Sequence, residues 1–162
     1  MAVTRRTRLG IAVASTILAA GLTGCGVVSP DMTAVDYEPG DGTMIIVEDV
    51  RALNLMIVSE GEGQNGVLIG AVANRGTSDQ DVSITLGEQE LYAGSVNAKA
   101  TELLETDDPI IVSNVPAQPG AMVDMSLSVS GAGTQSESVP VVDGTLPAYA
   151  EVLEKYGAEL AS

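Results

Sequence analysis

The feature that most constrains the fold of this chain is a period-two alternation of apolar and polar residues, interrupted by turn residues about every 8 to 12 positions. Residues 82–86 (VSITL) and 123–129 (VDMSLSV) alternate most regularly. Successive side chains of a strand point to opposite faces of a sheet, so each run predicts a strand with one face in a core and one in water. Residues 67–73 (VLIGAVA) are apolar at both sets of positions, which predicts a central strand.

The remaining apolar runs predict further short strands separated by loops rich in Gly, Pro and Asn. These strands are expected at residues 44–47, 53–58, 91–96, 110–115 and 138–142. The loops between the runs supply residues that tolerate a positive φ or fix φ at a bend. About seven or eight strands within roughly 100 residues predict an all-β, immunoglobulin-like β-sandwich over residues 44–144.

After residue 144 the apolar period changes from two to that of a helix. The apolar stripe is formed by Tyr149, Val152, Leu153, Tyr156 and Leu160. Pro147 is compatible with a first helical turn, so residues 145–162 are predicted to form a short amphipathic C-terminal helix and tail. Such a stripe is buried either against the sandwich or on a partner protein. The candidate docking residues are therefore Tyr149, Val152, Leu153 and Tyr156.

Residues 1–24 have the organisation of a secretory signal peptide. Arg5, Arg6 and Arg8 precede an uncharged apolar stretch at residues 9–22, which is shorter than the roughly 20 residues that a membrane-spanning helix needs. The arginines also resemble a twin-arginine signal, but Arg8 stands where that motif prefers an apolar residue. We therefore favour export by the general secretory pathway.

The leader ends in Leu22-Thr23-Gly24-Cys25, which is similar to the lipobox of bacterial lipoproteins. In that motif the cysteine is acylated and becomes the first residue of the mature chain. An ordinary signal peptide with an incidental cysteine is the alternative, yet the sole cysteine stands where the motif requires it. A diacylglyceryl group joined by a further acyl chain such as palmitate gives stable anchoring. We expect a lipoprotein held by Cys25 on the extracytoplasmic face of the cell membrane.

The segment between this cysteine and the first predicted strand, residues 25–43, has no hydrophobic periodicity. It contains several Asp, Pro and Gly residues, so it is predicted to be a flexible acidic stalk.

The composition excludes large classes of function. The chain has no His, Phe or Trp and a single Cys, so it supplies no His general base, no Ser-His-Asp triad and no imidazole metal ligand. The net charge is -15, with 7 basic residues against 22 acidic ones, so a nucleic-acid partner is not expected. We expect neither an enzyme nor a protein with a bound cofactor.

Two further motifs have simpler interpretations than the chemistry that they resemble. Residues 61–66 (GEGQNG) match G-x-G-x-x-G, but a β-type run follows where a dinucleotide site needs a helix, so a hairpin turn is predicted. Asp79-Gln80-Asp81, Glu88-Gln89-Glu90 and Asp107-Asp108 lack the spacing of a calcium loop and are expected to be solvated surface charge.

Methionines are the soft ligands that remain once Cys25 is acylated, and thioethers suit Cu(I). Met122 and Met125 deserve attention, as do Met44 and Met56. A separation of three residues places Met122 and Met125 on opposite faces of a strand, with Met125 on the apolar face. Core packing is therefore the expected role, and no metal ligand is assigned.

Several of these residues together resemble a known family. Residues 66–76 (GVLIGAVANRG) with Asp81-Val82, then residues 120–127 (GAMVDMSL) and 138–141 (SVPV), are similar to strands of periplasmic copper chaperones of the PCu(A)C family. The resemblance implies a cupredoxin-like or immunoglobulin-like β-sandwich. That family binds Cu(I) through His and Met, and this chain has no His, so the resemblance carries over no copper ligand.

The lipobox, the acidic stalk and the domain without His further resemble the LpqE-type lipoproteins of actinobacteria, a group within that family. This resemblance implies an accessory role in the cell envelope, beside the respiratory cytochrome bcc–oxidase assembly. The sequence thus favours a non-catalytic, lipid-anchored binding protein that docks on a membrane protein complex. The alternative is a degenerate copper chaperone that uses Met and carboxylate ligands.

Overall fold

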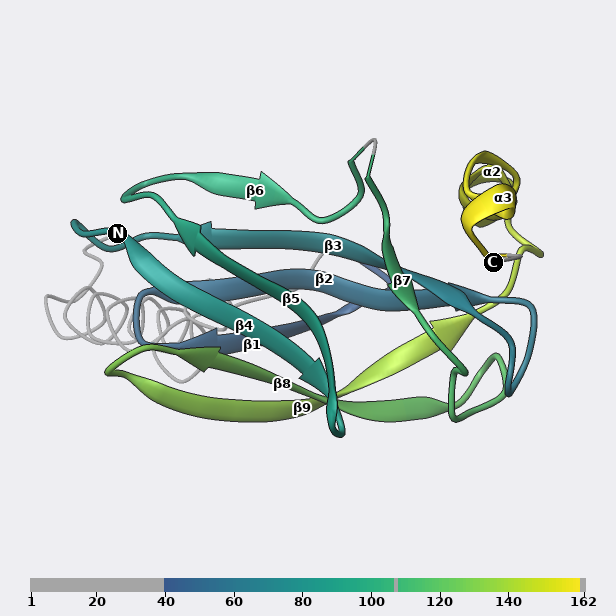
Figure 1. Cartoon of the computed structure of the whole chain (residues 1–162), viewed down its shortest axis with the longest axis horizontal. Helices are drawn as coiled ribbons and strands as arrows, with labels where there is room; N and C mark the ends of the chain where they lie inside the picture. Colours follow the sequence, from purple (N-terminus) through teal and green to yellow (C-terminus); the bar gives the residue numbers. More distant parts are fainter. Residues whose placement is uncertain (1–39, 107, 161–162) are drawn as a thin grey trace, which may run out of the picture. The chain divides into compact units, whose positions relative to one another are not determined.

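The computed structural model describes residues 40–106 and 108–160, which form nine strands and two helices (Figure 1). The strands are β1 (Thr43–Val47), β2 (Val50–Ser59), β3 (Gly66–Asn74), β4 (Gln80–Leu86), β5 (Gln89–Val96), β6 (Thr101–Leu103), β7 (Ile110–Val112), β8 (Met122–Val129) and β9 (Gly133–Val142). The helices are α2 (Pro147–Lys155) and α3 (Gly157–Leu160).

The predicted leader at residues 1–24, the predicted acylation site Cys25 and most of the predicted stalk lie outside the described residues. The end of the predicted stalk belongs to the domain. The Gly42 N–H donates to Asn54 Oδ1 at 3.0 Å, and the Tyr149 hydroxyl donates to Asp41 Oδ2 at 2.7 Å. β1 then begins at Thr43. Within residues 40–106 and 108–160, no helix combines the length and apolarity needed to cross a bilayer.

The strands form two layers joined by β9. Hydrogen-bonded neighbours follow the order β5-β4-β8-β9-β2-β3-β6, with β1 also paired to β2 and β7 to β3. The first part of β9 pairs antiparallel with β8, as at Met122↔Pro140, and its end pairs parallel with β2 at Ile57↔Val141. This architecture confirms the predicted all-β sandwich with a short C-terminal helix (Figure 1).

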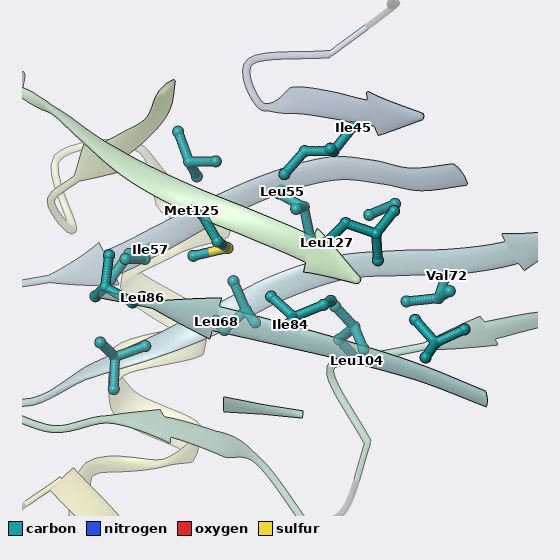
Figure 2. Packing of buried hydrophobic residues seen from close by; sticks show 14 of the residues in the cluster. Ile45, Leu55, Ile57, Leu68, Val72, Ile84, Leu86, Leu104, Met125 and Leu127 are labelled. Carbon is teal, nitrogen blue, oxygen red and sulfur yellow. The ribbon is translucent and has the colours of Figure 1, made fainter. Parts of the chain in front are cut away.

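The core lies between the inward faces of the two layers. On β8, Met125 and Leu127 are fully buried, whereas Asp124 between its buried neighbours is exposed, as the alternation predicted. Figure 2 shows Met125 among the aliphatic side chains of this larger apolar cluster, including Leu68 of β3 and Ile84 of β4. Burial of apolar surface between the layers is the main term that holds such a sandwich together.

A β-bulge in β2 changes which residues of that strand face the core. Leu53 pairs with Ala71, but the next pair is Met56 with Ile69, so β2 holds one residue more than β3 over this stretch. Asn54 takes a left-handed φ of 51° at the bulge. As a result Leu55 is buried in the larger cluster, on the same face of the strand as Ala52. Without the bulge, strict alternation would place Leu55 on the opposite face, together with Leu53.

The helices cover the outer face of β2 and β3 over the half beyond the bulge. The smaller apolar cluster has five buried residues, Met56, Val58, Val67, Ile69 and Tyr156. Tyr149, Val152 and Leu153 of α2 and Leu160 pack against it. Helix packing therefore explains the second apolar face of this segment at Val67 and Ile69. Helix α2 starts at Pro147 without a side-chain cap and relies on these tertiary contacts.

Candidate functional site

The methionines singled out in the sequence do not converge on one site. Met122 and Met125 lie on opposite faces of β8, with exposed fractions of 54% and 0%. Met56 is buried in the smaller cluster beneath the helices, separate from the larger cluster that holds Met125. Met44 is half-buried on β1. The placement confirms that Met125 packs in the core and leaves Met122 as an exposed thioether.

The acidic pairs lie on the surface of the domain. The exposed Asp79 carboxylate accepts a hydrogen bond from the Ala98 N–H at 2.9 Å, and Glu88 and Glu90 are exposed at the β4–β5 turn and on β5. Asp107 lies outside the described residues. Over the described ranges, no three His, Cys, Asp or Glu side chains are grouped closely enough to hold a metal ion.

The G-x-G-x-x-G segment is the hairpin loop between the antiparallel strands β2 and β3, as predicted. Two backbone hydrogen bonds fix this loop to Val115: the Gly63 N–H donates to the Val115 carbonyl, and the Val115 N–H donates to the Gln64 carbonyl, each at 2.8 Å. The next element is strand β3, so the phosphate-holding helix N-terminus of a dinucleotide site does not follow.

The four candidate docking residues of the C-terminal helix face the domain itself. Tyr156 is 4% exposed, and its hydroxyl donates to the Thr106 carbonyl at 2.6 Å. Tyr149, Val152 and Leu153 pack partly buried against the smaller cluster. Of the two positions that the sequence left open for this stripe, the structure shows the one against the sandwich. Docking of a partner on these four residues stays a prediction.

Sequence reasoning missed an apolar hollow beside the start of helix α2. It measures about 360 Å³ and is lined by Pro119, Gly120, Pro140, Val141, Val142, Asp143, Leu146 and Tyr149. Leu146 is 52% exposed, and the exposed Met122 is the register partner of Pro140. The lining comes from the β7–β8 loop, the end of β9 and helix α2. The sequence signals for this hollow were Pro140 within a predicted strand and Met122 on the side of its strand opposite the apolar face.

Two tyrosine hydroxyls donate to carboxylates at the edges of the domain. The hydrogen bond to Asp41 is the largest cause that raises the pKa of Tyr149 to about 12, and burial adds to it. Burial is the first cause that raises the pKa of Tyr92 to about 12, followed by its hydrogen bond to Glu102 at 3.1 Å. Both hydroxyls therefore stay protonated at neutral pH and act as hydrogen-bond donors that tie separate elements together.

Comparison with known proteins gave a structural likeness without a sequence match. No protein-family model matches the sequence, and no curated protein matches it. Among solved structures, the apo PCuAC domain from PmoF1 is 11% identical, covers 62% of this chain and 99% of its own, and gives a TM-score of 0.51. This chain has the fold of a PCuAC domain.

Two further PCuAC structures are similar at lower scores. The copper-bound PCuAC domain from PmoF2 is 12% identical, with a TM-score of 0.48 and coverage of 62% of this chain and 98% of its own. The apo PCuAC domain from PmoF2 is 12% identical, with a TM-score of 0.49 and coverage of 64% and 98%.

Proposed function

We propose that this chain is a non-catalytic, lipid-anchored binding protein of the cell envelope, which docks on a membrane protein complex through the apolar hollow at the start of helix α2. The observation that carries this proposal is an exposed leucine that lines the hollow, with an exposed methionine beside it. Leu146 lines the hollow, and Met122 pairs with Pro140, which also lines it. Exposed apolar surface beside a hollow is typical of sites where a partner's side chain is inserted.

Membrane anchoring is supported by the sequence alone. The lipobox-like segment ends at Cys25, and at the start of the described residues Gly42 is held to Asn54. Replacement of Cys25 by alanine is expected to release the protein from the membrane fraction into the soluble fraction. Retention of the Cys25→Ala chain on membranes after a high-salt wash would contradict anchoring by acylation.

The docking proposal is tested by cross-linking and co-purification from native membranes in mild detergent. Leu146→Ser should lower recovery of the partner complex, because it removes apolar contact area that lines the hollow. Met122→Ser should also lower it, because Met122 is exposed and pairs with Pro140 at the edge of the hollow. Leu103→Ser is the matched control, since Leu103 is 62% exposed on β6 and does not line the hollow. Equal recovery with all three variants would remove the hollow from the proposal. The resemblance to LpqE-type lipoproteins makes the cytochrome bcc–oxidase assembly the first complex to examine.

A second candidate function is a degenerate copper chaperone, which the PCuAC fold and one pair of side chains favour. Met122 and Asp124 are two residues apart on the outer face of β8 and both are exposed, so they offer a thioether and a carboxylate side by side. Titration of the protein with Cu(I) against a competing chelator tests this function, with Met122→Leu as the control. Failure of the protein to compete at any stoichiometry would end it.

A further inference from the structure

The cationic side chains of this acidic domain are unevenly distributed. The described residues include four of them, Arg51, Arg75, Lys99 and Lys155. Three occur near one end of the layer that contains β2, β3 and β6. Arg51 on β2 is the register partner of Ala73, Arg75 directly follows β3, and Lys99 precedes β6. The chain has 22 acidic residues, so a group of three basic residues stands out from the negative charge of the rest of the sequence.

The two turns that carry Arg75 and Lys99 are fixed to each other by Asn74. This side chain is 1% exposed, and its amide nitrogen donates to the carbonyls of Ser78 at 2.8 Å and Val96 at 2.9 Å. Its amide oxygen accepts from the Gly76 N–H at 2.9 Å. The Asn74 backbone N–H also donates to the Ala100 carbonyl at 2.9 Å. The β3–β4 turn and the β5–β6 turn are therefore held as one unit.

Within this frame the Lys99 ammonium is held against the backbone of Arg75. Lys99 takes a left-handed φ of 61°, which is unfavourable for a residue other than glycine, and its ammonium donates to the Arg75 carbonyl. The Arg75 N–H in turn donates to the Asp49 carbonyl at 2.8 Å, which fixes the backbone that carries the guanidinium. Two like charges on one hollow repel each other, and an anion bound between them would offset that repulsion.

Both cations line a hollow of about 330 Å³ that contains no carboxylate. Its lining residues are Leu53, Ala73, Asn74, Arg75, Lys99, Ala100 and Thr101. Three other hollows on the domain differ in sign, since each includes one carboxylate, from Asp81, Glu60 or Asp143, and no cation. Asp79 is nearby in the β3–β4 turn, but its carboxylate accepts from the Ala98 N–H and does not line the hollow.

We propose that this hollow binds a phosphate group through Arg75, Lys99 and Thr101. These three residues line one hollow from the β3–β4 turn, the β5–β6 turn and β6, and they offer a guanidinium, an ammonium and a hydroxyl. Such donors suit a tetrahedral oxyanion, whose oxygens accept hydrogen bonds in several directions. Leu53 and Ala73 give the hollow an apolar wall that an attached organic group can contact. The phosphate can come from free inorganic phosphate or from the headgroup of a phospholipid, and the proposal is independent of the docking hollow at α2.

The experiment is a titration of the ¹⁵N-labelled chain from residue 26 onward, with amide chemical shifts as the readout. This chain keeps every strand described above and both apolar clusters. One arm uses inorganic phosphate and the other a short-chain phosphatidylglycerol below its micellar concentration, both at constant ionic strength. Saturable shifts are expected in the turns at residues 75–79 and 97–100. Arg75→Gln and Lys99→Gln should each weaken binding about tenfold, because each removes a charge-assisted hydrogen bond. Lys155→Gln removes the same charge from helix α2 and should leave the affinity unchanged.

Each outcome decides the proposal. Binding of both compounds with similar affinity identifies a site for the phosphate group alone, and tighter binding of phosphatidylglycerol identifies a lipid headgroup site. The proposal is overturned if neither compound shifts these turns, or if Lys155→Gln weakens binding as much as Arg75→Gln. Unchanged affinity in both Arg75→Gln and Lys99→Gln, with the dispersion of a folded protein, would overturn it as well.

Discussion

Replacing Met125 by alanine should lower the free energy of unfolding by about 3 kcal/mol, whereas Met122→Ala should change it by less than about 0.5 kcal/mol. Met125 is fully buried in the larger cluster, and Met122 is 54% exposed. The truncation at Met125 removes three buried heavy atoms, worth about 0.8 kcal/mol each. A residual cavity of about 30 Å³ adds roughly 0.7 kcal/mol at about 24 cal/mol per Å³.

The assay is urea unfolding followed by far-ultraviolet circular dichroism, because the chain has no Trp to report by fluorescence. For a domain of this size a loss of about 3 kcal/mol corresponds to a thermal midpoint lower by roughly 12 °C. Met125→Leu is the volume-conserving control and should cost less than about 1.5 kcal/mol. Equal losses in Met125→Ala and Met122→Ala would refute the assignment of inward and outward faces on β8, and with it the argument against a two-methionine copper site.

Three other predictions concern hydrogen bonds. The hydrogen bond to Asp41 raises the pKa of Tyr149 above its ordinary 10.0 to about 12, so its contribution to stability is complete below pH 10 and is lost as pH rises from 10 towards 12. Asp41→Asn should therefore move the tyrosinate absorbance titration to lower pH, and an unchanged titration would contradict the contact. Tyr156→Phe removes the donor to Thr106 and should cost about 1 kcal/mol in urea unfolding, so an unchanged midpoint would count against that bond. Asn74→Ala leaves buried backbone partners unpaired and should cost about 2–4 kcal/mol in thermal unfolding, while a loss below about 1 kcal/mol would mean that water replaces the amide.

The sequence predicted the strands that carry apolar residues on one or both faces, and it failed where a strand is polar on both faces or very short. Residues 123–129 alternate because one face meets the core and the other meets water. The first part of β9, from Gly133 to Glu137, was missed because it has no apolar residue and is exposed at every position, although it pairs fully with β8. β6 was missed because a strand of three residues is too short for a period to be recognised.

The bulge at Asn54 and the apolar hollow were beyond sequence reasoning for a different reason. A bulge depends on the count of residues in the opposite strand, so residues 53–58 (LNLMIV) do not reveal it alone. The hollow combines Pro119, Pro140 and Leu146, which only the folded topology brings together. In contrast, the helix at the C-terminus was predictable, because its apolar stripe follows one continuous segment.

The start of the described domain has a mechanical consequence. Asp41 is bonded to Tyr149 of helix α2, and Gly42 is bonded to Asn54 at the bulge of β2. A pull on the chain before Gly40 therefore loads helix α2 and the bulge before the force reaches the β1–β2 ladder. Because Tyr149 also lines the apolar hollow, a force applied at Gly40 is transmitted directly to the surface where we propose that the partner binds.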